Sequence, residues 1–187
     1  MSKTETKSTV LVNHHLKQLK LPTMHSECEK VAARSAGENL DHLAFLLSLC
    51  ELELVERERR AAERRLKSAK FPAHKTLDDF DFTAQPSVNK PLVLELIKGE
   101  YLEKRENLIL VGASGTGKTH LATALGMAAC LAGKKVRFFR VTELITTLIE
   151  ARDEKLLLRL RSQLAKQHLL ILDELGYVPA SKVGAEL

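Results

Sequence analysis

Hydrophobic positions recur at helical spacing in the first part of the chain. Between residues 38 and 70 the sequence contains no proline or glycine, and leucines occur at positions 40, 43, 47 and 54. This spacing places the leucines on one side of a helix, so we predict one long helix or two in this stretch. Residues 1–12 are mostly polar and predict a frayed tail, and residues 13–37 predict a short helix or two interrupted by Pro22.

The pattern changes after residue 106 to short apolar runs that alternate with longer helical stretches. The runs lack the alternating polar positions of a half-exposed strand, so they indicate strands covered on both faces. Strands of this kind, separated by helices, are typical of an α/β fold in which crossover helices join parallel strands. The predicted strands are 107–111, 136–141 and 169–172, and the predicted helices are 118–131, 142–165 and, beginning after Pro91, 92–104.

An aromatic-rich segment separates these two parts. Residues 71–82, FPAHKTLDDFDF, contain a proline, paired aspartates and three phenylalanines. This composition suits an ordered linker that packs aromatic side chains on a neighbouring domain. We therefore predict a small all-helical N-terminal domain at residues 1–72 and an α/β domain at residues 73–187.

Composition and charge exclude some classes of protein. The chain is 44% apolar and 28% charged, which suits a folded globular protein rather than a disordered one. Its net charge of +5 favours polyanionic partners without requiring one. Three widely spaced cysteines without a CxxC pattern indicate buried, reduced thiols, and neither a signal peptide nor an apolar stretch of about twenty residues is present. We expect a cytoplasmic protein with no membrane partner.

A glycine-rich sequence lies between the first predicted strand and the helix after it. Residues 112–119, GASGTGKT, match the pattern GxxxxGK[ST]. Its glycines let backbone amides converge on phosphate oxygens, and the start of the helix adds the positive end of its dipole. Lys118 can place its ammonium between the β- and γ-phosphates, and the Thr119 hydroxyl can coordinate Mg²⁺. The predicted nucleotide-binding residues are Gly112, Ala113, Ser114, Gly115, Thr116, Gly117, Lys118, Thr119 and His120.

Two carboxylates follow the last predicted strand, in LLILDE at residues 169–174. Because parallel strands end at the same edge of a sheet, Asp173 is suited to holding the Mg²⁺ shell beside the phosphate loop. Glu174 is suited to orienting and deprotonating a water molecule. The alternatives are a solvated turn for Asp173 and a phosphotransferase site, which would not need Glu174. The combination predicts a nucleoside triphosphate hydrolase.

The segments GASGTGKTHLATALG, LLILDELGYVP and FPAHKTLDDFDF resemble IstB-type AAA+ ATPases, transposition helpers related to DnaC-type helicase loaders and to DnaA. The resemblance covers nearly the whole chain. It implies an AAA+ P-loop fold with ATP and Mg²⁺ as cofactors. It also implies ATP-dependent assembly of a homo-oligomer on double-stranded DNA, which directs a transposase encoded nearby to target DNA. By the same resemblance Lys118 and Glu174 are catalytic, Thr119 and Asp173 hold the metal, and residues 80–82 lie near the adenine.

The chain departs from the family at its C-terminal end. It stops at Leu187 in ASKVGAEL, which looks like the opening of a helix. Family members continue with a strand that senses the γ-phosphate, an arginine finger and a further strand. The first of these strands lies between the P-loop strand and the carboxylate strand. We therefore expect a C-terminally incomplete ATPase domain that hydrolyses ATP poorly or not at all.

Other functions stay open at this level. A DnaC-type helicase loader would use the same site, and a noncatalytic module would bind DNA or a partner through the helical region whatever happens at Lys118. A P-loop small-molecule kinase is disfavoured, because the aspartate-glutamate pair suits water activation. The candidate DNA contacts share one face of the long predicted helix, for which an ion-paired, solvated surface is the alternative; they are Arg57, Arg60, Arg64 and Lys67.

Overall fold

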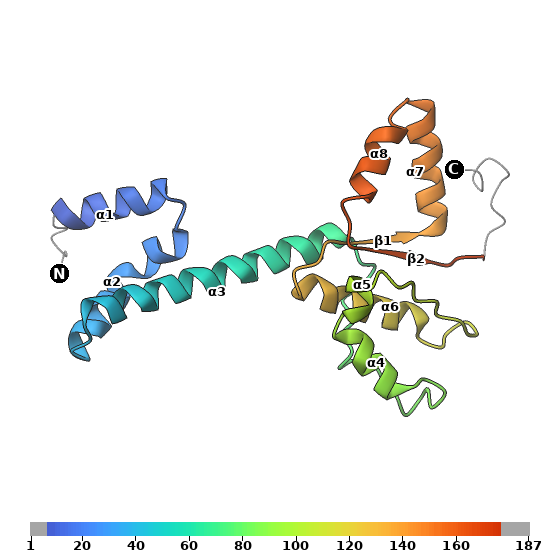
Figure 1. Ribbon diagram of the computed structural model, residues 1–187, viewed down its shortest axis with the longest axis horizontal. Coiled ribbons are helices and arrows are strands. Elements are labelled where there is room, and N and C mark those ends of the chain that lie inside the picture. Colours follow the sequence, from blue (N-terminus) through green and yellow to red (C-terminus); the bar gives the residue numbers. More distant parts are fainter. Residues whose placement is uncertain (1–6, 177–187) are drawn as a thin grey trace. The chain divides into compact units, whose positions relative to one another are not determined.

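The computed structural model describes residues 7–176 (Figure 1). The chain divides into two compact units between Ala61 and Ala62, inside the helix α3 (His42–Ala69). This division falls before the predicted boundary near residue 72, because the last turns of α3 pack with the α/β unit.

The first unit consists of α1 (Lys7–Gln18), α2 (Pro22–Gly37) and the first part of α3. The prediction of a frayed tail was wrong for residues 7–12, because their apolar residues join the helix α1, which packs against α2. The predicted interruption at Pro22 is confirmed. Proline occupies the first turn of α2, where its missing N–H costs no hydrogen bond.

A buried carboxylate joins α3 to the start of α2. Glu53 is 3% exposed, and its Oε2 accepts hydrogen bonds from the backbone N–H groups of Thr23 (2.8 Å) and Met24 (3.1 Å). Arg60 donates to the Thr23 hydroxyl, and Arg57 lies 3.6 Å from the other Glu53 oxygen. The carboxylate therefore satisfies two amides that a helix start leaves without intrahelical partners.

The second unit contains a parallel pair of strands, β1 (Val136–Arg140) and β2 (Leu169–Asp173). Val136 is opposite Leu169 and Arg140 is opposite Asp173. Helix α6 (Lys118–Leu131) lies on one face of the pair, and the connection between the strands, α7 (Val141–Asp153) and α8 (Leu157–Leu164), lies on the other (Figure 1). This arrangement confirms the predicted α/β unit with parallel strands and crossover helices.

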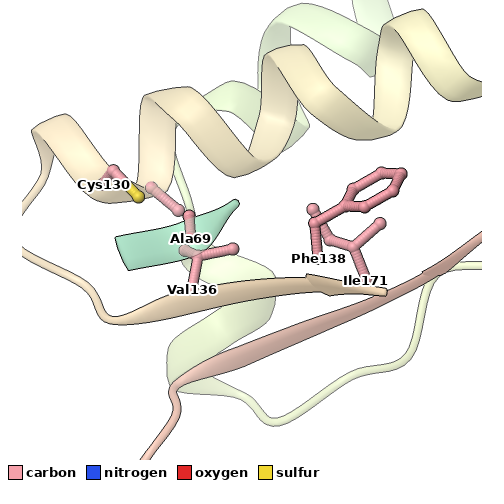
Figure 2. Close-up of a cluster of buried hydrophobic side chains, with 6 residues drawn as sticks. Ala69, Cys130, Val136, Phe138 and Ile171 are labelled. Atoms are coloured by element: carbon pink, nitrogen blue, oxygen red, sulfur yellow. The ribbon is translucent and has the colours of Figure 1, made fainter. Parts of the chain in front are cut away.

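The core of this unit lies between α6 and the strands, with the last turn of α3 against it (Figure 2). Its buried side chains are Ala69, Ala129, Cys130, Val136, Phe138 and Ile171. A Cβ on Gly126 of α6 would lie 2.6 Å from Ile171 Cδ1, so this glycine allows the helix to approach the sheet closely. Phe71 packs edge-on against Phe138, which confirms the predicted role of this linker residue as an aromatic anchor. Burial raises the pKa of the Cys130 thiol.

Two of the predicted helices are broken in the structure. The stretch 92–104 forms α4 (Lys90–Ile97) and α5 (Glu100–Glu103), separated at Gly99, whose φ is +83°. The stretch 142–165 forms α7 and α8, with Lys155 in the left-handed region at φ +59° between them. Asn89 caps α4 by accepting a hydrogen bond from Leu92 N (3.1 Å).

The strand predicted at 107–111 is not formed in the structure. Ile109 is 83% exposed and Val111 is 89% exposed, and among residues 7–176 no strand pairs with this segment. A strand requires backbone hydrogen-bond partners, and the β1–β2 pair supplies none to residues 107–111. The predicted helical opening at ASKVGAEL lies outside the described residues.

Within the described part of the chain, no helix combines the length and apolar character needed to cross a membrane.

Candidate functional site: a phosphate loop beside a carboxylate

The glycine-rich segment forms a loop that leads directly into α6. Gly115 and Gly117 have φ values of +78° and +85°, a left-handed backbone that favours glycine. Gly117 is the N-cap of α6, so the amides of the first turn of α6 and the positive end of its dipole lie at the end of the loop. This local geometry is that of an anion-binding helix start.

Lys118 closes the loop on itself. Its Nζ donates hydrogen bonds to the carbonyl oxygens of Gly112 (2.8 Å) and Ala113 (2.7 Å). The Thr116 hydroxyl also donates to Ala113 O, at 2.8 Å. The ammonium is therefore held within the curve of the loop, where a polyanion lying along the loop would meet it.

A side-chain hydrogen bond joins the end of β2 to the start of α6. The Thr119 hydroxyl lies 3.0 Å from both carboxylate oxygens of Asp173 and donates to them, although the two residues are 54 positions apart. A hydroxyl and a carboxylate at this separation are oxygen donors of the kind that Mg²⁺ prefers. The structure thus places Asp173 beside the phosphate loop, where the sequence predicts it.

Glu174 follows Asp173 at the edge of the sheet. It is exposed and has a φ of +62°, a backbone region that non-glycine residues rarely occupy. Such backbone outliers cluster at functional sites. Glu174 lines the same cleft as Lys118 and Thr119.

These residues line a cleft of about 1010 Å³. Its walls include loop residues Ser114 and Gly115, the segment 107–110 and the whole of β2. The volume is at the upper end of the range of about 300–1,000 Å³ for small-molecule sites. The loop, the hydroxyl-carboxylate pair and the room beside them fit a nucleoside triphosphate with a divalent metal.

Unlike the other predicted nucleotide-binding residues, His120 has a side chain that contacts residues 76 and 80. Its Nε2 lies 2.8 Å from Thr76 O, and its ring stands edge-on to Phe80 at a centroid distance of 5.2 Å. The side chain is thus engaged with residues 76–80. In the same turn, Thr76 donates hydrogen bonds to Asp79 from its N (3.0 Å) and its Oγ1 (2.7 Å), and these bonds lower the pKa of the Asp79 carboxyl.

The family resemblance places residues 80–82 near the adenine, whereas in the structure the Phe80 ring is packed against the phosphate loop. Phe80 is buried at 8% exposure in a cluster with Val93 and Leu121, and its ring touches the backbone of Gly117. Residues 71–82 are predicted to carry aromatic anchors, and Phe80 confirms this, but nothing in the local pattern indicates that its target is the phosphate loop.

The sequence profile of the family described as "IstB-like ATP binding protein" matches residues 14–187. The chain belongs to this family. The match confirms the resemblance of the glycine-rich and carboxylate segments to IstB-type proteins.

Several relatives named for insertion sequences and for ATP binding align with most of this chain. A protein of insertion sequence IS21 from Pseudomonas aeruginosa is 41% identical over 92% of this chain and 65% of its own length. A protein of IS5376 from Geobacillus stearothermophilus is 35% identical over 89% of this chain and 66% of its own length. A protein of IS232 from Bacillus thuringiensis is 37% identical over 92% and 69%, respectively. The chain therefore spans about two thirds of the length of these IstB-like relatives.

Proposed function

We propose that this IstB-like chain binds ATP with Mg²⁺ and acts as a regulatory ATPase in the transposition of an insertion sequence. The observation that carries the proposal is the contact of Thr119 with Asp173 next to the loop that holds Lys118. Phosphate-binding and metal-binding groups from distant parts of the chain meet there in one cleft. The names of the relatives support both ATP binding and the link to insertion sequences.

Each residue at the cleft has a role in this proposal. The loop amides of residues 112–119 and the Lys118 ammonium bind the phosphates, and Thr119 and Asp173 hold Mg²⁺. The metal supplies charge neutralisation at the phosphate oxygens when it is bound. Glu174 orients the attacking water and accepts its proton. His120 belongs to the binding region through its backbone and its neighbours rather than through a phosphate contact of its ring.

The fold of the complete ATPase is the second part of the proposal. We expect an AAA+ sheet in which a further parallel strand lies between residues 107–111 and β2. Apolar side chains on both sides support this, because Ile109, Leu170 and Leu172 are exposed along the walls of the cleft. In the longer relatives such a strand would come from the chain beyond the aligned part. Its hydrogen bonds would convert residues 107–111 into the strand that the sequence predicts.

The partners follow from the family resemblance and from the charge of the chain. We propose double-stranded DNA, a transposase encoded nearby and other copies of this chain. The net charge of +5 supports a polyanionic partner. Of the four candidate DNA contacts on α3, Arg60 hydrogen-bonds to α2 and the exposed Arg57 hydrogen-bonds to the turn before α2, whereas Arg64 and Lys67 are exposed without a described contact to α2. The DNA-contact proposal therefore rests mainly on Arg64 and Lys67.

The test measures binding of a fluorescent ATP analogue and of a DNA duplex by the purified chain. With Mg²⁺ present, we expect wild-type protein to bind the analogue and Lys118→Ala to bind it at least about tenfold more weakly, because a charge-assisted contact to phosphate is lost. Lys98→Ala, at the exposed C-terminal end of α4, is the matched control and should bind as wild type does. DNA binding that ignores both ATP and Lys118→Ala would instead support a noncatalytic module.

A further inference from the structure

The phosphate loop rests against an aromatic side chain from residues 76–82. Phe80 belongs to a buried cluster with Val93 of α4 and Leu121 of α6, surrounded by Leu77, Phe82 and Val88. Phe82 packs edge-on against Phe80 at a centroid distance of 4.9 Å. Because the ring is enclosed by these side chains, it is fixed as part of the core rather than presented as a surface for a nucleotide base.

The contact between Phe80 and the loop is a close one. A Cβ built on Gly117 would lie 2.6 Å from Phe80 Cε2 and 3.3 Å from Cζ. The glycine backbone therefore lies directly against the ring at the start of α6. Any displacement of the ring changes the position of the peptide that precedes the Lys118 amide.

His120 fixes both ends of the turn that carries Phe80. The Thr76 carbonyl only accepts hydrogen bonds, so Nε2 of His120 carries a proton and donates to it at 2.8 Å. The His120 and Phe80 rings form a T-shaped pair with an interplanar angle of 88°. Between these two contacts the backbone turns through the Phe80 N to Leu77 O hydrogen bond of 3.1 Å. A single side chain of α6 therefore holds residues 76 and 80 at fixed positions relative to the loop.

We propose that His120 is a positioning residue for the phosphate loop: it holds Phe80 against Gly117 and so keeps the loop amides aligned for phosphate binding. The proposal deepens the ATP-binding function and rests on it. Amide donors lose strength steeply when their geometry departs from that of a good hydrogen bond, so a small shift at Gly117 weakens phosphate binding. In this proposal the histidine acts through Phe80, which its ring contacts, although it also lines the cleft.

The first measurement needs no nucleotide. We expect the Phe80 ring to shift the Gly117 Hα resonances in the NMR spectrum of the 187-residue chain, because Gly117 lies beside the ring. In His120→Ala we expect this ring-current shift to shrink, and in His120→Gln, whose amide nitrogen can donate to Thr76 O, we expect most of it to return. His74→Ala changes an exposed histidine of the same segment and should leave Gly117 unchanged. An unchanged Gly117 shift in His120→Ala would overturn the inference, whether or not the chain binds ATP.

The second measurement is the affinity of the same variants for a fluorescent ATP analogue with Mg²⁺. We expect His120→Ala to bind about three- to tenfold more weakly, the effect of about one hydrogen bond, with rescue in His120→Gln. A role confined to stability would lower the melting temperature in both variants and leave the affinity of the folded protein unchanged, which would contradict the proposal. Wild-type protein that binds no ATP would refute the proposed function itself, a result distinguishable from an unchanged Gly117 shift.

Discussion

Two glycines of the phosphate loop share a left-handed backbone but differ in what surrounds them. Gly115 has no atom within 4 Å of the position of an added Cβ, whereas at Gly117 such an atom meets the Phe80 ring. A glycine of the loop can thus be required for backbone conformation alone or for conformation and space together. The motif GxxxxGK[ST] fixes glycine at position 117 but leaves position 115 variable, so it does not identify the backbone requirement at Gly115.

This difference predicts unequal effects of the same substitution. Gly115→Ala should lower the free energy of unfolding by about 1–2 kcal/mol, the cost of a left-handed backbone for alanine. Gly117→Ala carries that cost and also displaces a buried ring, so we expect a total of about 3 kcal/mol or more. Urea unfolding followed by circular dichroism measures both. Equal losses in the two variants would mean that the Phe80 ring yields freely.

At the scale of elements, the start of one helix depends on a side chain from another helix. Helix α2 begins at a proline, and the carboxylate that accepts its first amides comes from Glu53, in the middle of α3. Glu53 is buried, so its carboxylate is poorly hydrated, and one of its oxygens has no hydrogen-bond partner among the described residues. The two amide hydrogen bonds at the start of α2 are therefore its main stabilising contacts.

Glu53→Ala should therefore destabilise the helical unit. It leaves the Thr23 and Met24 amides without their acceptor and removes the carboxylate beside Arg57, so we expect a loss of about 1–3 kcal/mol. Glu51→Ala changes an exposed glutamate of the same helix and should cost less than about 0.5 kcal/mol. The comparison is made on the thermal midpoint of the circular dichroism signal at 222 nm. Similar midpoints for the two variants would show that the cap contributes little to this unit.

The same elements show which parts of the fold sequence patterns predict and which parts they miss. The helix at 118–131 and the strands at 136–140 and 169–173 are predictable because their apolar spacing is a local property. The segment 107–111 has an equally apolar sequence, yet a strand depends on a partner elsewhere in the chain, and no described residue provides one. The break between α7 and α8 at Lys155 contains no glycine or proline, so the sequence gives no signal for it.

The candidate site divides in the same way. Residue types and their spacing suffice to identify Lys118, Thr119 and Asp173, because phosphate and metal chemistry restrict which side chains can serve. The rule that parallel strands end at one edge of a sheet predicts that Thr119 and Asp173 lie close together, and the structure contains this contact although residues 107–111 form no strand. The contact of Phe80 with Gly117 obeys no such rule. It depends on how residues 76–82 pack, which the sequence expresses only as a preference for aromatic anchors.

At the scale of the whole molecule, the chain matches a family over residues 14–187 and spans about two thirds of the length of its relatives. The cleft beside the phosphate loop is bounded by residues 107–110 and by β2, so the proposed additional strand would fill the part between these segments and leave the part beside the loop to the nucleotide. Catalysis and completion of the sheet are thereby linked in our proposal.

We expect ATP hydrolysis to depend on this completion. The 187-residue chain should hydrolyse ATP at least about a hundredfold more slowly than a version extended past Leu187 to the length of its relatives, since groups that stabilise the transition state contribute factors of this size or more. Release of inorganic phosphate measures both rates, with Glu174→Gln in the extended version as the control for background activity. Equal rates in the two versions would show that the first 187 residues are sufficient.

The hold of Lys118 on two carbonyl oxygens of its own loop has a consequence for selectivity. Two of the three N–H donors of the ammonium are used within the loop, so an incoming anion can gain more than one of them only by replacing Gly112 O or Ala113 O. A chain of phosphates offers several charged oxygens at once, whereas chloride or a single carboxylate offers fewer. We therefore expect this lysine to favour polyphosphates over small anions.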